Sequence, residues 1–245
     1  MSLDHTQRTY ERFGREDPLY AVLTTEQFRH GRNEDEFFAT GREEVGRVMG
    51  RLAELRLEVA RGRALDFGCG VGRLTQALGD HFEQAVGVDI AASMVERARA
   101  ANRHGERVTY VVNTVPDLSV FGDASFDFVY SNITLQHVPP EASRRYMAEF
   151  LRVLRPGGVS VFQVPNGRPY PLGGWQEWLY RVRRQYLRRL WKRVRGKAPY
   201  EMHYVPRATV ERIVADGGRR MVHVDDVARR EGQNLRYYVV RQSAA

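Results

Sequence analysis

Residues 64–75 read Ala64-Leu65-Asp66-Phe67-Gly68-Cys69-Gly70-Val71-Gly72-Arg73-Leu74-Thr75. A short apolar run contains an acid, three glycines follow at alternate positions, and a helical pattern begins at Arg73. Glycine adopts backbone conformations that strain other residues, so this order predicts a β-strand, a tight turn and the start of an α-helix. Backbone N–H groups at such a turn can bind a ligand directly.

Asp89 ends the next apolar run, Ala85–Val88, and is the second acid of the pattern. Its distance from the glycines is typical of a carboxylate that hydrogen-bonds a ribose, because its two oxygens can pair with two adjacent hydroxyl groups. Ile90 and Met94 fit an apolar slot for a flat ring such as adenine. The two acids and the glycines therefore predict a nucleoside-containing ligand.

Two features separate this motif from a dinucleotide site. The dinucleotide fingerprint is G-x-G-x-x-G, in which the third glycine lets helix and strand pack around a pyrophosphate. Here the glycines run G-x-G-x-G, Arg73 occupies the sixth position, and Asp66 lies where a carboxylate would repel a pyrophosphate. The same carboxylate suits a ligand with a cationic end, such as an amino-acid ammonium beside a sulfonium. A nicotinamide-dependent oxidoreductase is the weaker alternative.

The segment Leu65–Thr75, with Asp89 downstream, resembles the cofactor-binding motifs of the class I S-adenosylmethionine (SAM)-dependent methyltransferases. The resemblance covers Arg63–Val164 and, more weakly, the C-terminal strands. It implies an α/β, Rossmann-like fold with a seven-stranded, mostly parallel sheet and helices on both faces. It also implies SAM as the cofactor and S-adenosylhomocysteine (SAH) as its product. No metal is expected, because the acids and histidines show no zinc-type ligand spacing.

The resemblance assigns cofactor-binding residues to the ends of successive strands. After the third strand, family members place an acid that receives the adenine amine. Here Asn113 or Thr114 holds that position and Asp117 lies slightly late. An asparagine carbonyl can accept the same hydrogen bond. The expected cofactor-binding residues are Asp66, Gly68, Cys69, Gly70, Gly72, Asp89, Ile90, Met94, Asn113, Thr114, Val115, Ser131 and Asn132.

Two histidines are candidates for a catalytic general base. His137 is the first, because imidazole titrates near neutral pH, and a ring that packs on the sheet is its structural alternative. His203 is the second. Methyl transfer is a direct displacement, so positioning can supply much of the barrier reduction without a base. The expected substrate-binding residues are Tyr10, Phe13, Tyr20, His137, Trp175 and His203.

The chain reads as one domain, residues 1–245, in four parts: a helical cap (1–60), a SAM-binding core (61–165), a basic helical lid or insert (166–205) and a C-terminal helix with two strands (206–245). Aromatic residues of the cap, including Phe37, either pack on the sheet or form a mobile cover. Apolar strands that alternate with amphipathic helices predict a parallel sheet. The expected strands are Ala64–Phe67, Ala85–Asp89, Val108–Asn113, Phe126–Ser131, Gly158–Val164, Arg219–Val227 and Leu235–Arg241. The expected helices are Asp35–Leu57, Arg73–His81, Ser93–Asn102, Glu141–Leu154 and Arg207–Asp216.

Positive charge is concentrated in one segment. Residues 166–198 contain ten Lys or Arg and one acid, a net charge of +9, whereas the whole chain carries +8. Apolar residues recur in residues 175–194 at helical spacing, which predicts an amphipathic helix. Three interpretations remain: a lid on its own domain, a surface for an anionic substrate or a membrane, or an RNA contact. The last is the weakest, because no nucleic-acid-binding module accompanies the charge.

Composition restricts the environment of the chain. A hydrophobic share of 42% in 245 residues is enough for a full core, and no apolar run is long enough to cross a membrane. A single cysteine, Cys69, fits a reducing compartment, so we expect a cytoplasmic protein, with peripheral contact at the inner membrane face through residues 175–197 as an alternative. We expect O-methylation of a small-molecule or glycan-type acceptor. An anionic or lipid-linked acceptor is one form of this expectation. N-methylation and a non-catalytic SAM-binding protein are the alternatives.

Overall fold

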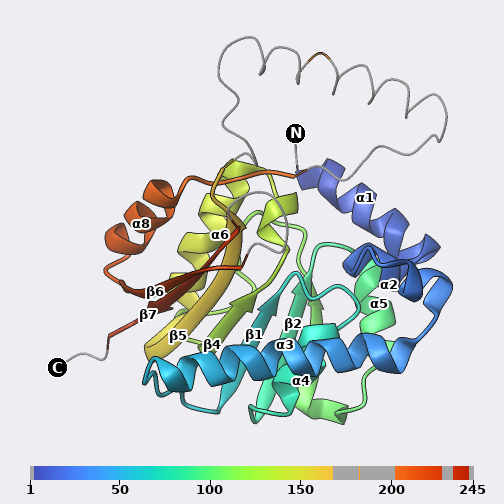
Figure 1. Ribbon diagram of the computed structural model, residues 1–245, viewed down its shortest axis with the longest axis horizontal. Coiled ribbons are helices and arrows are strands. Elements are labelled where there is room, and N and C mark those ends of the chain that lie inside the picture. Colours follow the sequence, from blue (N-terminus) through green and yellow to red (C-terminus); the bar gives the residue numbers. More distant parts are fainter. Residues whose placement is uncertain (1–2, 168–181, 183–201, 228–233, 243–245) are drawn as a thin grey trace.

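The computed structural model describes residues 3–167, 182, 202–227 and 234–242. Its centre is a seven-stranded sheet in the order β3-β2-β1-β4-β5-β7-β6 (Figure 1). The strands are β1 (Arg63–Phe67), β2 (Gln84–Asp89), β3 (Val108–Val112), β4 (Phe126–Ser131), β5 (Leu154–Pro165), β6 (Arg220–Asp226) and β7 (Asn234–Val240). The expected α/β fold with a seven-stranded sheet is therefore confirmed.

The first five strands run parallel to one another, and β7 pairs antiparallel with both β5 and β6. Chain order reverses at β1, since the chain goes from β1 outward to β2 and β3 and then returns to β4 on the other side. In such sheets ligands bind beyond the carboxyl ends of the strands at this reversal. The glycine turn, Asp89, Asn113 and Asn132 all follow strands at this edge.

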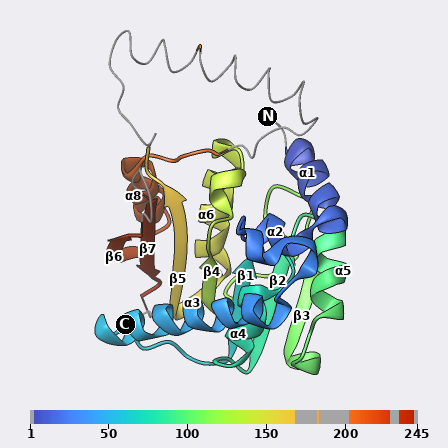
Figure 2. The same cartoon turned by 45° about the vertical axis from the view of Figure 1, so that its right-hand side comes forward.

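Helices cover both faces of the sheet (Figures 1 and 2). One face carries α3 (Glu34–Glu54), α4 (Arg73–Gly79) and α5 (Ala92–Ala100), and the other carries α6 (Pro140–Val153) and α8 (Arg207–Asp216). The remaining helical pieces are α1 (Leu3–Glu16), α2 (Pro18–Val22), η1 (Glu26–Gly31), η2 (Gly105–Arg107) and η3 (Leu135–His137). Among the described residues, no helix combines the length and apolar character needed to cross a membrane.

The first helix, α1, docks on the start of α5, beside which it lies in Figure 2. Gly14 allows the close approach, because a Cβ at this position would lie 2.3 Å from the Ser93 hydroxyl. That hydroxyl donates to the Glu11 carbonyl (2.9 Å), and the Ser93 N–H donates to the Glu11 carboxylate (3.2 Å). The α1 helix thus supplies an acceptor to the first turn of α5, which has no side-chain cap of its own.

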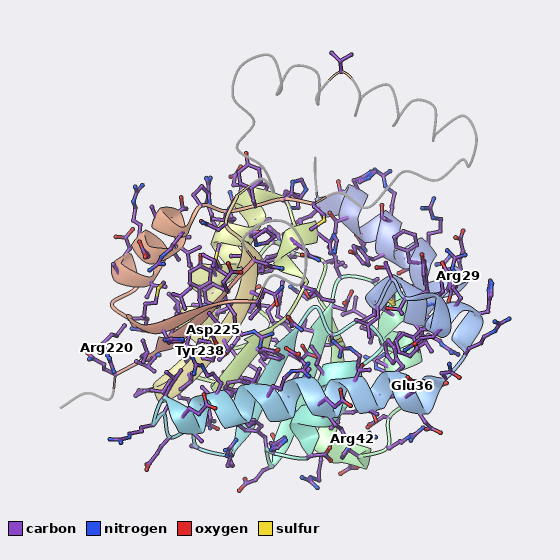
Figure 3. The ribbon with its side chains drawn as sticks, in the orientation of Figure 1. Arg29, Glu36, Arg42, Arg220, Asp225 and Tyr238 are labelled. Carbon is purple, nitrogen blue, oxygen red and sulfur yellow. The ribbon has the colours of Figure 1, made fainter. Side chains whose placement is uncertain are left out.

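The long helix α3 reaches the opposite edge of the sheet. Its Arg51 donates to Asp225 of β6 at 2.9 Å. Figure 3 shows Asp225 beside Tyr238 of β7, near one end of this helix. Near the other end, Phe37 is fully buried between Phe28 and Phe38. The interpretation of Phe37 as part of a mobile cover was therefore wrong, because its ring is a core side chain.

Most element boundaries agree with the expectations to within three residues, and Phe126–Ser131 and Arg207–Asp216 agree at both ends. Two differences have clear causes. The α3 helix ends at Glu54 instead of Leu57, since Arg56 adopts a left-handed conformation with φ of +54°. The strand expected from Gly158 begins at Leu154, because Leu154 already pairs with Phe126 and the following residues form a register shift.

A pair of glycine substitutions tests the docking of α1. Gly14→Ala is expected to lower the free energy of unfolding by about 1–3 kcal/mol, because the added methyl group displaces the Ser93 hydroxyl. Gly46→Ala on α3 is the matched control, since a Cβ there meets nothing within 4 Å. It should raise stability by about 0.5–1 kcal/mol through helix propensity. Urea unfolding measures both, and equal stabilisation by the two changes would contradict the docking contact.

Candidate functional site

The glycine turn after β1 uses backbone conformations that favour glycine. Gly68, Gly70 and Gly72 have φ of +76°, +53° and +85°. The N–H groups of Gly68 and Cys69 both donate to the Val88 carbonyl at the end of β2, at 2.8 and 3.1 Å. The turn is therefore fixed to the neighbouring strand before any ligand binds.

Space also requires two of these glycines. A Cβ on Gly68 would lie 2.1 Å from the Thr134 methyl group, and one on Gly72 would lie 2.4 Å from the Tyr110 hydroxyl. Arg73 follows the turn and is buried. Its backbone carbonyl would lie 2.3 Å from a Cβ on Gly41, so α3 packs closely against the start of α4.

Asp89 connects the turn to β2. Its carboxylate accepts the Gly70 N–H and the Ala91 N–H, both at 2.9 Å. Burial raises the pKa of Asp89, and the backbone hydrogen bonds partly oppose that rise. A carboxylate has about four lone-pair sites, so two remain for further donors such as ribose hydroxyls.

Asp66 lies in the strand behind the turn and is 1% exposed. One oxygen accepts the Thr75 hydroxyl at 2.7 Å, and the other has no hydrogen-bond partner among the described residues. Burial raises the pKa of Asp66 to about 6, although Thr75 and Arg73 lower it. Asp66 is therefore a buried acid whose charge changes near neutral pH.

Asn113 begins the loop after β3. Its amide nitrogen donates to the carbonyls of Val115 (3.2 Å) and Asp117 (2.7 Å). The Tyr146 hydroxyl also donates to the Val115 carbonyl, at 2.7 Å. These contacts fix which side of the amide carries the nitrogen, so its oxygen is the group left to accept a hydrogen bond from a ligand.

The end of β4 is tied to the end of β1. The Ser131 hydroxyl donates to the Phe67 carbonyl at 3.2 Å, and the Thr134 hydroxyl donates to the Gly68 carbonyl at 3.4 Å. Between them, Ile133 has φ of +55°, which is strained for a β-branched residue. Asn132, 9% exposed, donates its amide nitrogen to Glu44 at 3.4 Å, and its oxygen has no partner among the described residues.

These groups surround a pocket of about 920 Å³, a volume that includes its open mouth. The wall opposite the strand ends is supplied by α1 through Leu3, Thr6 and Tyr10, at helical spacing. The Tyr10 ring lies 5.9 Å from the His137 ring. The His137 Nε2 atom lies 3.0 Å from the Gln136 amide nitrogen, which can only donate, so Nε2 is the acceptor.

The structure brings many of the predicted site residues together and leaves others outside the pocket. Those that line it are Gly68, Cys69, Gly70, Asp89, Ile90, Met94, Asn113, Asn132, Tyr10 and His137. Those outside its lining are Asp66, Gly72, Thr114, Val115, Ser131, Phe13, Tyr20 and His203, and Trp175 lies outside the described residues.

The structure shows the contacts or the exposure of several predicted residues that lie outside the lining. Phe13 packs edge-on against Tyr10, and Tyr20 lies under the Arg29 guanidinium. Thr114 and Val115 are exposed. The His203 N–H donates to the Gln136 carbonyl at 2.6 Å, which puts its backbone next to η3.

Sequence reasoning missed several lining residues, chiefly Leu3, Thr6, Val22, Arg73, Ile133 and Tyr146. Only Arg73 belongs to a motif, and no sequence signal reveals a positive φ at an isoleucine. Burial raises the pKa of the Cys69 thiol, so it stays protonated and is a poor nucleophile. The described residues contain no group of three or more His, Cys, Asp or Glu that could hold a metal ion.

The raised pKa of Asp66 predicts a pH-dependent stability. The folded chain keeps this proton up to pH of about 6, whereas the reference value is 3.8. The contribution of Asp66 to stability is therefore full below pH 3.8 and is lost as pH rises through about 6. Between pH 4 and 7 the wild type should lose about 2–3 kcal/mol relative to Asp66→Asn. Urea unfolding of both proteins across this range measures it, and parallel curves would contradict the assignment.

Comparison with known proteins agrees with this geometry. The family model described as a methyltransferase domain matches residues 65–162. The chain is 37% identical over 116 residues to a ubiquinone biosynthesis O-methyltransferase of Xanthomonas euvesicatoria pv. vesicatoria, covering 46% of this chain and 47% of that protein. It is 37% identical over 105 residues to a trans-aconitate 2-methyltransferase of Deinococcus radiodurans, covering 42% and 38%. The chain thus spans about half the length, or less, of these curated relatives.

The fold likeness extends further than the sequence match. The crystal structure of magnesium protoporphyrin IX methyltransferase from Synechocystis PCC 6803 with bound SAH has a TM-score of 0.65 at 18% identity. That alignment covers 98% of this chain and 99% of the other. The sequence match is thus to a methyltransferase domain over residues 65–162, and the likeness in fold extends over nearly the whole chain.

Proposed function

We propose that this chain transfers a methyl group from SAM to an oxygen atom of a small molecule and leaves SAH. The observation that carries the proposal is the order of acceptor groups along the sheet edge. Asn113 follows β3, Asp89 ends β2 and the glycine turn follows β1, and all three border one pocket. This order matches the adenine, ribose and amino-acid parts of SAM.

Buried polar atoms without partners support the fit. Asn113 offers a carbonyl to the adenine amine, and Asp89 offers two remaining lone-pair sites to the ribose. At the other end of the pocket, the unpartnered oxygen of Asn132 suits an ammonium group. The buried Arg73 guanidinium, which lines the pocket, suits the carboxylate of the same zwitterionic end.

When bound, SAM supplies a methyl group on a sulfonium, whose transfer is an in-line displacement. The residues of this chain hold the reactants and exclude water, since α1 forms a wall over the strand ends. We propose that His137 borders the acceptor and takes its proton at Nε2, the atom that the Gln136 amide now faces. His203 is the second candidate for this role.

The acceptor side of the pocket supports a small, largely apolar molecule. Its wall consists of Leu3, Tyr10, Ile133 and Val138, with His137 as the titratable group. One relative is named for O-methylation, which favours oxygen over nitrogen as the acceptor atom. A glycan needs many hydrogen-bonding groups, and this apolar wall offers few. The lid, membrane and RNA interpretations concern residues 175–197, which lie outside the described residues apart from Val182, and remain predictions.

Calorimetry with SAH tests the cofactor assignment. The wild type should bind SAH and not NAD, because Asp66 disfavours a pyrophosphate. Asp89→Ala should weaken SAH binding by about a hundredfold, since two charge-assisted hydrogen bonds to the ribose are lost. Asp80→Ala, an exposed acid outside the pocket, is the matched control and should bind normally. Binding of NAD in place of SAH would instead favour the oxidoreductase alternative.

A turnover assay tests the role of His137. Methyl transfer is measured as label incorporated from methyl-labelled SAM into a panel of phenols, hydroxy acids, carboxylic acids and amines. With the best acceptor, His137→Ala should lower kcat by about 10²–10⁴, the usual contribution of a general base, and leave SAH affinity unchanged. His203→Ala should change kcat far less. If both variants keep full kcat, positioning alone drives the reaction, and wild type without turnover on any acceptor points to a non-catalytic SAM-binding protein.

A further inference from the structure

Glu44 is a buried carboxylate that the cofactor motif does not contain. It lies in the middle of α3 and is 6% exposed. It accepts the Tyr130 hydroxyl at 2.9 Å and an Arg47 N–H at 2.5 Å, and it pairs with Arg236 of β7. Burial alone raises the pKa of Glu44, but Arg236, Arg47 and Tyr130 together lower it to about 2. Glu44 therefore stays ionised throughout the physiological pH range.

The fourth donor to Glu44 is Asn132, at 3.4 Å. An ionised carboxylate can only accept hydrogen bonds, so the Asn132 amide must turn its nitrogen towards Glu44. The amide oxygen then has no partner among the described residues, although Asn132 is buried and lines the pocket. A buried carbonyl without a partner costs free energy, which a ligand donor would recover.

The position of Asn132 indicates which part of the ligand it meets. Asn132 follows β4, on the far side of β1 from Asp89 and Asn113. If the nucleoside lies over β2 and β3, the other end of the ligand lies over β1 and β4. Arg73, a buried cation, lines the same pocket. A carbonyl acceptor and a guanidinium together match an amino-acid zwitterion.

We propose that Glu44 is a positioning residue, which orients the Asn132 amide so that its oxygen accepts a hydrogen bond from the ammonium group of the cofactor. This inference rests on the proposed SAM-binding function and adds a residue of the N-terminal helical region to it. Glu44 does not touch the ligand in this arrangement and acts only through Asn132.

Two ligands separate this role from a structural one. SAH contains the amino-acid end, whereas 5′-deoxy-5′-methylthioadenosine has the same nucleoside and sulfur without it. Glu44→Gln removes the charge that orients Asn132 and keeps the side-chain size. Calorimetry should show the SAH dissociation constant rising about tenfold, the effect of one hydrogen bond to a charged group. The dissociation constant of methylthioadenosine should stay within about twofold, because its contacts lie over β2 and β3.

Tyr130→Phe is the matched control. It removes another donor to Glu44 but leaves the carboxylate and Asn132 in place. It should lower thermal stability without changing the ratio of the two dissociation constants. If Glu44→Gln does not fold, Glu44→Asp decides the question, since it keeps the charge near Arg236 but is too short to reach Asn132.

A double-mutant cycle tests whether Glu44 acts through Asn132. Asn132→Leu should raise the SAH dissociation constant as Glu44→Gln does, and the double variant should show no further loss. Equal weakening of both ligands, no change for either, or additive losses would each overturn the inference. A wild type that binds neither ligand would overturn the proposed function itself, so the two failures are distinguishable.

Discussion

The pocket depends on the two hydrogen bonds that Asp89 accepts from Gly70 and Ala91. Removing a carboxylate from water is costly unless donors replace the water, and these backbone N–H groups are the replacement. The Gly70 bond needs the left-handed turn, and the turn needs glycine. The acid at the end of β2 and the glycines after β1 are therefore one structural unit. A change in either part disturbs the other, although Gly70 and Asp89 are nineteen positions apart in the sequence.

A buried acid, Glu44, links the pocket to parts of the chain that are far apart in the sequence. Glu44 of α3 joins Arg236 of β7 to Tyr130 and Asn132 of the β4 segment. Breaking such a buried ion pair leaves an uncompensated charge, which is strongly destabilising. The N-terminal helical region and strand β7 thus support the pocket, because their ion pair contacts Asn132 at its β4 end.

The sequence predicted features that depend on neighbouring residues and missed contacts between residues far apart in the chain. The glycine turn and Asp89 could be read directly, since their roles follow from spacing and backbone conformation. Glu44 could not, because Arg236 is 192 positions away and only folding brings them together. The α1 wall was anticipated at Tyr10, but Leu3 and Thr6 became visible only once the helix was placed over the strand ends. For Phe37 the sequence left core packing and a mobile cover both open, because aromatic composition does not reveal depth.

The position of Arg73 changes the physical argument about ligand choice. Its sequence position suggested only a missing third glycine, yet the structure makes it a buried cation at the pocket wall, which would attract a pyrophosphate. The acids near Arg73 must then be the groups that disfavour binding of a dinucleotide. Asp66 is buried and Asp89 half-buried beside the glycine turn, and Glu44 is ionised behind Asn132. A ligand with a carboxylate for Arg73, hydroxyl groups for Asp89 and an ammonium group for the Asn132 oxygen satisfies each of these groups, whereas a pyrophosphate satisfies only Arg73.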